Sequence, residues 1–264
     1  MQKFLAKRGY IIILVVILTV GVYMMNFNTS YSDKTNNSKI LYEEVINNNS
    51  IYDVTEMDEV DGLFYDNSSN EYYFNGNVEN NYIVINNELW RIVAINEDKS
   101  VKVIKQSGIN SNKLYVYNTD YSNFRYQDSV VMKELSSWYK ENLSSVDEYI
   151  LDSEYCINYQ NGKCFEYDSY KIGLLDISEV RRAGGEINTN NDAYYLYNEN
   201  DWWIIDTDYD EMLGSAFSGY VNLLGSIDKG FVDEEMTIRP VINLKKEVPI
   251  NGSGTLEDPY YIVK

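Results

Sequence analysis

The side chains with the clearest capacity for chemistry lie in residues 202–211, which read WWIIDTDYDE. Trp202 and Trp203 offer indole rings that can stack on a sugar, beside carboxylates that can accept hydrogen bonds. The carboxylates are Asp206, Asp208 and Asp210. We take these five residues as the candidate ligand surface. For the two tryptophans the alternative is burial in the core, and we favour that interpretation.

Alternating aspartates can also coordinate calcium. A calcium loop of the EF-hand type needs glycine at its sixth position and glutamate at its twelfth. Counted from Asp206, those positions hold Glu211 and Phe217. We therefore expect residues 206–211 to form a solvated acidic loop, with adventitious calcium as the second interpretation, and we predict no metal site and no cofactor.

Histidine is absent from the sequence. Its absence excludes Ser-His-Asp and Cys-His catalysis and zinc held by histidine. Carboxylate-based hydrolysis of the glycosidase type stays open, because it needs only two acids about 5 to 10 Å apart across a cleft. The chain has 41 acidic residues, so its sequence nominates no catalytic pair.

Cys156 and Cys164 are the only two cysteines, and they flank the dipeptide Asn161-Gly162, a strong tight-turn signal. If this part of the chain lies outside the membrane, thiols there oxidise. The spacing predicts a disulfide that closes a small hairpin. A reactive thiol pair is the alternative.

The N-terminus predicts a membrane anchor. Residues 9–27 carry no charge and follow Lys7 and Arg8. A helix of this length spans about 28 Å, close to the hydrocarbon core of a bilayer. Because positive residues stay on the cytoplasmic side, residues 1–8 are predicted to be cytoplasmic and the remainder extracellular, in a single-pass protein of the cell membrane. A cleaved signal peptide is the competing interpretation.

Beyond the anchor, we expect a linker and lead-in over residues 28–61 and one extracytoplasmic domain over residues 62–264. An apolar content of 44% is sufficient for a core. The net charge is -19. This acidity argues against nucleic acid as a partner, because affinity for phosphate backbones comes largely from Lys and Arg.

The element pattern predicts a β-rich domain of the α+β class with two short helices. Residues 80–105 read as a three-stranded meander joined by tight turns. Periodic apolar residues predict a helix over 129–143, capped by Asp128 or Ser129. A second helix follows a strand over 171–175, with Asp176 and Glu179 forming a capping box.

Further strands are expected at residues 194–197 and 202–205. Residues 236–244 read as one strand, at an edge or bulged where Pro240 removes a hydrogen-bond donor. In so acidic a domain, we expect Arg91 and Arg239 each to pair with a carboxylate.

Three blocks of the sequence carry a resemblance. They are NVENNYIVINNELWRIVAIN, KIGLLDISEVRRAGG followed by YYLYN, and TIRPVINLKKEVPINGSGTLEDPYYIV. Together they resemble a family of uncharacterised, membrane-anchored surface proteins of low-GC Gram-positive bacteria and their wall-less relatives, from about Gly62 to the C-terminus. Family members commonly have an aromatic residue and then Ser-Pro where this chain has residues 202–206. The resemblance implies a location and no activity.

The order of strands and helices is also similar to C-type-lectin-like and formylglycine-generating-enzyme-like domains, although fold does not decide function. We expect a surface binding or interaction module whose partner is a wall glycan, a host glycan or a surface protein. The alternative is a carboxylate-based hydrolase acting on cell-envelope glycans. A structural subunit of the envelope is a third option, which no motif favours.

Overall fold

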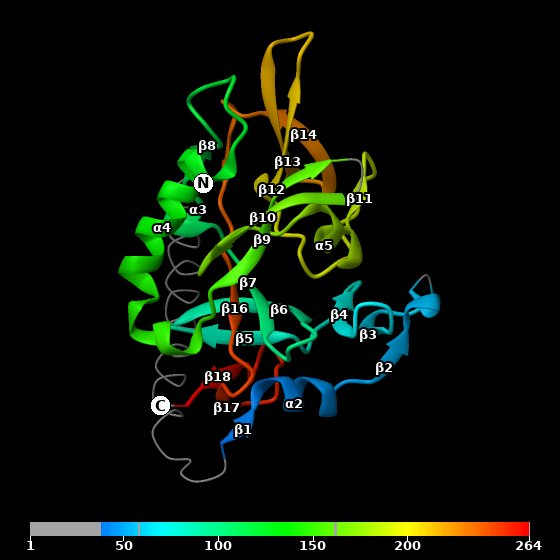
Figure 1. The fold of residues 1–264 in the computed structure, drawn as a ribbon. Helices are drawn as coiled ribbons and strands as arrows, with labels where there is room; N and C mark the ends of the chain where they lie inside the picture. The colour runs from blue at the N-terminus through cyan, green and yellow to red at the C-terminus, as the bar shows by residue number, and fades with distance from the viewer. Residues whose placement is uncertain (1–37, 58, 161–162, 264) are drawn as a thin grey trace, which may run out of the picture. The chain divides into compact units, whose positions relative to one another are not determined.

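Strand β6 (Glu88–Ile95) lies at the centre of the larger of two main sheets in the computed structural model (Figure 1). The structure describes residues 38–57, 59–160 and 163–263. They form a strand-rich domain of mixed α+β class. The predicted anchor at residues 9–27 lies outside the described residues. Among the residues that are described, no helix is both long and apolar enough to cross a membrane.

The larger sheet has the strand order β1-β17-β18-β5-β6-β4-β3-β2, and β7 joins it by pairing with both β6 and β16. Its other members are β1 (Lys39–Ile40), β2 (Ile51–Asp53), β3 (Gly62–Asp66), β4 (Glu71–Asn75), β5 (Tyr82–Ile85), β7 (Val101–Lys105), β16 (Val241–Leu244), β17 (Pro249–Asn251) and β18 (Tyr260–Ile262).

Strands β5, β6 and β7 pair in sequence as antiparallel neighbours, which confirms the predicted meander. Asn86 and Asn87 join the first two with φ values of 50° and 64°. This left-handed pair suits the twist of a two-residue hairpin, and asparagine tolerates it better than most residues. The apolar side chains of β6 then fill the core, where Trp90 and Ile92 are fully buried.

The compact unit covers Lys39–Lys264. It therefore starts before the predicted boundary at residue 62, because β1 pairs with β17 and β2 pairs with β3. Helix α2 (Leu41–Asn47) follows β1 directly and buries Leu41 and Val45. The lead-in segment is thus part of the domain from Lys39 onward.

The smaller sheet has the strand order β11-β14-β13-β12-β15-β8. Its members are β8 (Leu114–Val116), β11 (Glu186–Ile187), β12 (Trp202–Asp210), β13 (Ser215–Val221), β14 (Ser226–Phe231) and β15 (Glu235–Thr237). Figure 1 shows β12 and β13 as a hairpin that extends away from the larger sheet.

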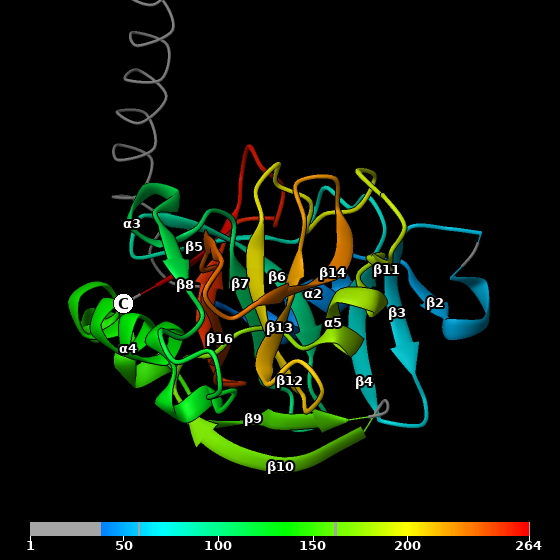
Figure 2. The same cartoon turned by 90° about the horizontal axis from the view of Figure 1, so that it is seen from above.

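A separate hairpin is formed by β9 (Ser153–Gln160) and β10 (Lys163–Tyr170), drawn as a curved ribbon on one side of the domain in Figure 2. Cys156 and Cys164 form a disulfide across it, as predicted. Both cysteines are therefore in a disulfide in this structure, and the alternative of a free, reactive thiol pair does not apply to it.

Helix α4 (Val130–Asn142) confirms the clearest helical pattern of the sequence. The Ser129 hydroxyl caps it by accepting a hydrogen bond from the Met132 amide at 3.0 Å. Leu135 and Trp138 are buried, and the Trp138 ring lies 6.2 Å from that of Trp90. The apolar stripe therefore packs the helix against the meander.

Helix α5 (Ile177–Arg182) begins at the predicted capping box. The Asp176 carboxylate accepts from the Glu179 amide, and the Glu179 carboxylate accepts from the Asp176 amide. Glu179 also forms an ion pair with Lys102 on β7. These contacts fix the start of α5 against the larger sheet.

The remaining short elements are α3 (Ile109–Asn112), in which Asn110 and Ser111 have left-handed backbone angles, and three 3-10 turns. The 3-10 turns are η1 (Val54–Glu56), η2 (Tyr126–Asp128) and η3 (Ser144–Tyr149).

Two predicted strands are wrong. Residues 171–175 make one bridge, from Gly173 to Val241, and one further backbone hydrogen bond, from the Ile205 amide to the Leu175 carbonyl, before the chain turns into α5. Residues 194–197 form a turn, in which the Tyr197 amide donates to the Tyr194 carbonyl. Three consecutive residues there are buried, Tyr194, Tyr195 and Leu196. That pattern fits a turn rather than the alternation of a strand.

The strand predicted over residues 236–244 is two strands in different sheets. Its first part, β15, pairs with β8 in the smaller sheet, and its second part, β16, pairs with β7 in the larger one. Residues 238–240 cross between them and are buried. Pro240 lies at this crossing, where its missing N–H breaks no ladder hydrogen bond.

Arg91 and Arg239 are buried without carboxylate partners, so the predicted ion pairs are wrong. Among the described residues, neither forms an ion pair, and both donate to neutral oxygens instead. Arg91 donates to Asn81 Oδ1 and to the Val78 carbonyl, both at 2.6 Å. Arg239 donates to the carbonyls of Lys105 at 3.0 Å and Leu196 at 2.6 Å. These arginines tie loops to the sheet.

Candidate functional site

Strand β12 contains a large bulge opposite β13. Trp203 pairs with Tyr220 and Thr207 pairs with Ser218. Three residues of β12, at positions 204–206, therefore lie opposite the single residue Gly219. Bulges bend a strand and redirect side chains, and they are enriched next to functional sites. This bulge sets the position of Asp206.

Neighbouring groups hold the bulge in place. The Ser218 hydroxyl lies 3.2 Å from the carbonyl oxygens of both Ile204 and Asp206. The Tyr117 hydroxyl donates to the Ile205 carbonyl at 3.2 Å. Gly219 packs closely opposite, because a Cβ atom there would lie 2.7 Å from Ile204 Cδ1 and the Ile204 side chain would have to move. The backbone carbonyls of all three bulge residues therefore have hydroxyl groups within hydrogen-bond distance.

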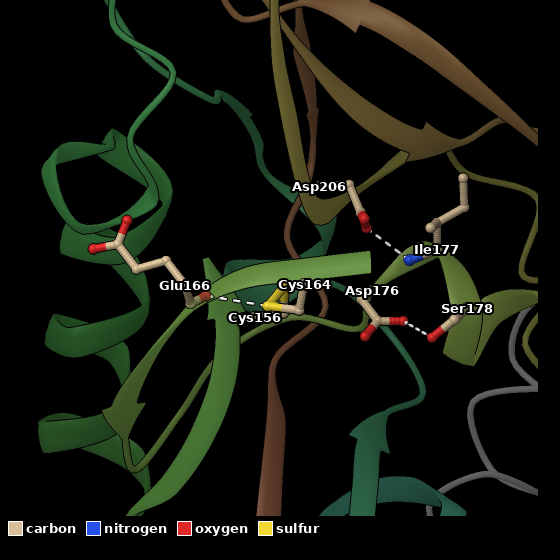
Figure 3. The surroundings of a disulfide bond; sticks show 7 residues. All are labelled: Cys156, Cys164, Glu166, Asp176, Ile177, Ser178 and Asp206. Carbon is tan, nitrogen blue, oxygen red and sulfur yellow. Dashed lines mark hydrogen bonds between the residues drawn. A yellow bond between two sulfur atoms is a disulfide. The ribbon is translucent and has the colours of Figure 1, made fainter. Parts of the chain in front are cut away.

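Asp206 joins this bulge to the start of α5. Its Oδ2 accepts a hydrogen bond from the Ile177 amide at 2.6 Å, as Figure 3 shows. Its Oδ1 is buried and has no hydrogen-bond partner among the described residues. Burial, followed by the nearby charge of Asp176, raises the pKa of Asp206 to about 8. Asp206 is therefore protonated at neutral pH, and one of its oxygens has an unmet requirement for a partner.

Beside Asp206 lies a pocket of about 710 Å³, which we call the Asp206 pocket. Its lining comes from β12, β13 and β14, together with Ile177 from α5 and Ile187 from β11, the strand that pairs with β14. Across the sheet face, Asp208 pairs with Phe217, and Phe217 pairs with Phe231. The two phenyl rings lie 4.5 Å apart between centroids. Phe217 lines the pocket, so an aromatic ring lies among its carboxyl groups.

The pocket contains one ion pair, between Lys229 and Asp208. Lys229 donates to Asp208 Oδ2 at 2.7 Å. Partial burial would raise the pKa of Asp208, but the hydrogen bond and charge of Lys229 outweigh it, so the pKa lies below its usual value. Asp228 also lines the pocket and accepts from the Asn222 amide group at 2.6 Å. Protonated and ionised carboxyl groups therefore share one cavity.

The structure separates the five residues of the candidate ligand surface. Trp202 and Trp203 are 1% and 0% exposed, so neither can stack on a ligand, which agrees with the interpretation favoured for them. Trp203 Nε1 donates to the Tyr115 carbonyl at 2.8 Å, and the Arg239 guanidinium lies 4.7 Å from the Trp202 ring.

Asp206 and Asp208 line the pocket, whereas Asp210 does not. The Asp210 carboxylate instead accepts from the Met212 and Leu213 amides at the tip of the hairpin, at 2.8 and 3.0 Å. The loop expected over 206–211 is wrong in its larger part, because β12 continues to Asp210. Pairing with β13 extends the strand through these aspartates.

Sequence reasoning missed the residues that complete the pocket, including Phe217 and Lys229. They come from β13 and β14, whose register with β12 is set by the bulge and has no local signal in the sequence. The available hint was Ser218-Gly219, a small pair inside an apolar run, which is typical of a close backbone approach.

Among the residues that the structure describes, no group of three or more His, Cys, Asp or Glu side chains is placed to hold a metal ion. Comparison of this chain with protein-family models, with curated proteins and with solved structures gives no match. Function must therefore be argued from the pocket.

Proposed function

We propose that this chain is a membrane-anchored, extracytoplasmic binding protein for a glycan of the cell envelope, with the Asp206 pocket as its binding site. The observation that carries the proposal is the unpartnered Oδ1 of Asp206 beside a cavity of about 710 Å³. Buried polar atoms in native proteins nearly always have a partner. A hydroxyl group of a ligand can supply it after a small local adjustment.

The surroundings fit a sugar. Phe217 lines the same pocket, and an aromatic ring can pack against the apolar face of a pyranose. Asp208, Lys229 and Asn188 add donors and acceptors at the rim. A protonated Asp206 can donate as well as accept, which suits the hydroxyl groups of a neutral sugar.

The cellular setting belongs to the same proposal. The uncharged run at residues 9–27 supports a single-pass anchor in the cell membrane with the domain outside. A disulfide between Cys156 and Cys164 suits that oxidising side. The finer fold class, C-type-lectin-like, is likewise proposed on the order of elements, and such a domain presents its ligand outward from a β-rich scaffold.

Binding of envelope glycan fragments to the full chain in detergent tests the proposal. We expect Phe217→Ala to weaken binding about tenfold, a typical loss for one aromatic contact. Phe165→Ala is the matched control, because Phe165 is 64% exposed on β10 and does not line the pocket. Isothermal titration measures both variants. Equal affinities for the two, or no binding by the unmodified chain, would contradict the proposed site.

A hydrolase is the second candidate, favoured by one observation. Asp206 and Asp208 are two residues apart on β12, and their pKa values are shifted in opposite directions. Two residues along a strand span about 6.6 Å, near the carboxyl separation of inverting glycosidases. One protonated and one ionised carboxyl group is the pairing that such catalysis uses.

Release of reducing ends from wall glycan measures this activity. If the chain is a hydrolase, Asp206→Asn and Asp208→Asn each lower the rate at least about a hundredfold, because each removes one of the two required groups. Asp210→Asn is the control, since Asp210 lies outside the pocket. An unmodified chain that releases no reducing ends, or an Asp206→Asn variant with full activity, rules the hydrolase out.

A further inference from the structure

A second cavity, of about 570 Å³, lies next to the Asp206 pocket. Both cavities are lined by Ile177 and Ile187, so these two side chains form a shared apolar ridge. We call this second cavity the Arg181 pocket. Its polar lining includes Ser178, Arg181 and Arg182 from α5. Together the two cavities offer a site longer than one sugar ring.

The two arginines of the second cavity differ in their charge balance. Arg182 donates to Glu71 at 3.0 Å and lies 3.5 Å from Asp66, and its guanidinium lies 5.2 Å from the centre of the Tyr73 ring. It is therefore fixed and neutralised by the protein itself. Arg181 is exposed and forms no ion pair within the described part of the chain.

The chain has 41 acidic and 22 basic residues. Arg91 and Arg239 also lack a carboxylate partner among the described residues, but they are buried, whereas Arg181 is exposed and lines a cavity. Glu186 is the carboxylate that shares the cavity with it, at the start of β11. A guanidinium with free N–H groups binds a carboxylate in a two-point geometry. The Arg181 pocket thus has the chemistry to receive one negative group next to the Asp206 pocket.

We infer that the ligand is an extended glycan that carries carboxylate groups, with one sugar in the Asp206 pocket and the carboxylate of a neighbouring sugar on Arg181. This inference rests on the proposed function and deepens it. The apolar ridge of Ile177 and Ile187 would contact the ring faces between the two ends. A dense polyanion does not fit, because the domain's net negative charge repels it.

Two tetrasaccharides with one backbone test the inference. One alternates N-acetylglucosamine with N-acetylmuramic acid and so carries carboxylates, and the other is chitotetraose, which has none. The full chain is expected to bind the carboxylated probe about tenfold more tightly. Arg181→Gln is expected to remove that preference and leave affinity for chitotetraose unchanged, whereas Arg181→Lys keeps part of it. Isothermal titration at low and high salt gives the affinity of each of the three proteins for each of the two probes.

Arg125→Gln is the control, because Arg125 is also exposed and lines neither cavity. Equal affinity for the two probes, or an Arg181→Gln variant that keeps the preference, overturns the inference while the glycan-binding function stands. If the chain binds neither probe, the proposed function fails together with it. Preferential binding of an acidic hexapeptide over both sugars overturns the inference in favour of a peptide ligand.

Discussion

Replacing Trp203 by Ala is expected to lower the free energy of unfolding by about 3 to 5 kcal/mol, the range for removing a large buried aromatic side chain. Trp203 is fully buried, and its ring meets that of Tyr117 edge-on at 5.5 Å between centroids. The substitution leaves a cavity and removes the hydrogen bond that the Tyr115 carbonyl now accepts from Trp203 Nε1. Both losses add to the same cost.

Urea denaturation followed by circular dichroism measures this change. Trp203→Phe is the informative control, because it keeps a ring and loses the hydrogen bond, so we expect a smaller loss of about 1 to 3 kcal/mol. Phe165→Ala, on the exposed face of β10, should change stability by less than about 0.5 kcal/mol. A Trp203→Ala variant as stable as the unmodified chain would place Trp203 outside the core and reopen it as a ligand contact.

Asp206→Asn is expected to stabilise the protein at alkaline pH. The pKa of Asp206 is raised to about 8 in the folded chain, from a usual value of 3.8. Between these values, the unfolded chain has released the proton and the folded chain still holds it. Raising the pH over this window therefore favours unfolding, and the effect levels off above about pH 8. Asparagine has no proton to lose, and its side-chain oxygen can still accept from the Ile177 amide.

A difference of about four pKa units sets an upper limit of about 6 kcal/mol. Because Asp206 is partly exposed, we expect about half of that as the gain of Asp206→Asn at pH 9, and a much smaller gain at pH 5. Urea titrations at the two pH values give the comparison. Asp208→Asn is the matched control, and its effect on the free energy of unfolding should have the opposite sign. The pKa of Asp208 is lowered in the folded chain, so removing this carboxylate destabilises the protein above pH 4. Equal gains at both pH values would mean that Asp206 titrates normally.

Local signals in the sequence were sufficient for several elements. The turn at Asn86 and Asn87, the cap at Ser129 and the capping box at Asp176 each depend on residues within four positions of one another. The disulfide of the β9–β10 hairpin is equally local. Both partners of each such interaction lie close together in the sequence, so the local residue pattern is enough to predict the interaction.

Two of the wrong predictions share a different cause. In each of them, pairing with a segment distant in the sequence determines the secondary structure. Residues 236–244 have the pattern of one strand, yet the first part pairs with β8 and the second part pairs with β7. The partners of β12 likewise extend it through the aspartates that were expected to form a loop. β-pairing between remote segments leaves no mark on the spacing of residues in either one.

The candidate site shows the same division. Asp206 and Asp208 could be selected as candidate site residues from their types and spacing. Their different burial, which gives them different protonation states, could not be predicted from the sequence. That burial depends on α5, because the Ile177 amide meets Asp206 from a helix that begins 29 positions earlier in the chain. Phe217 and Arg181 had no signal of their own.

The bulge in β12 has a consequence for how this protein tolerates insertions and deletions. Side chains alternate along a strand, so a shift of one residue reverses the face of every side chain beyond it. The number of residues in the bulge at 204–206 therefore determines which face of the sheet the later side chains of β12 occupy. Deleting one of them would turn Asp208 away from Phe217 and Lys229 while leaving the composition of the segment almost unchanged. Variation in length at this point would remove the Asp208 carboxylate from the pocket, even though most substitutions on the exposed hairpin tip beyond it would leave Asp208 in place.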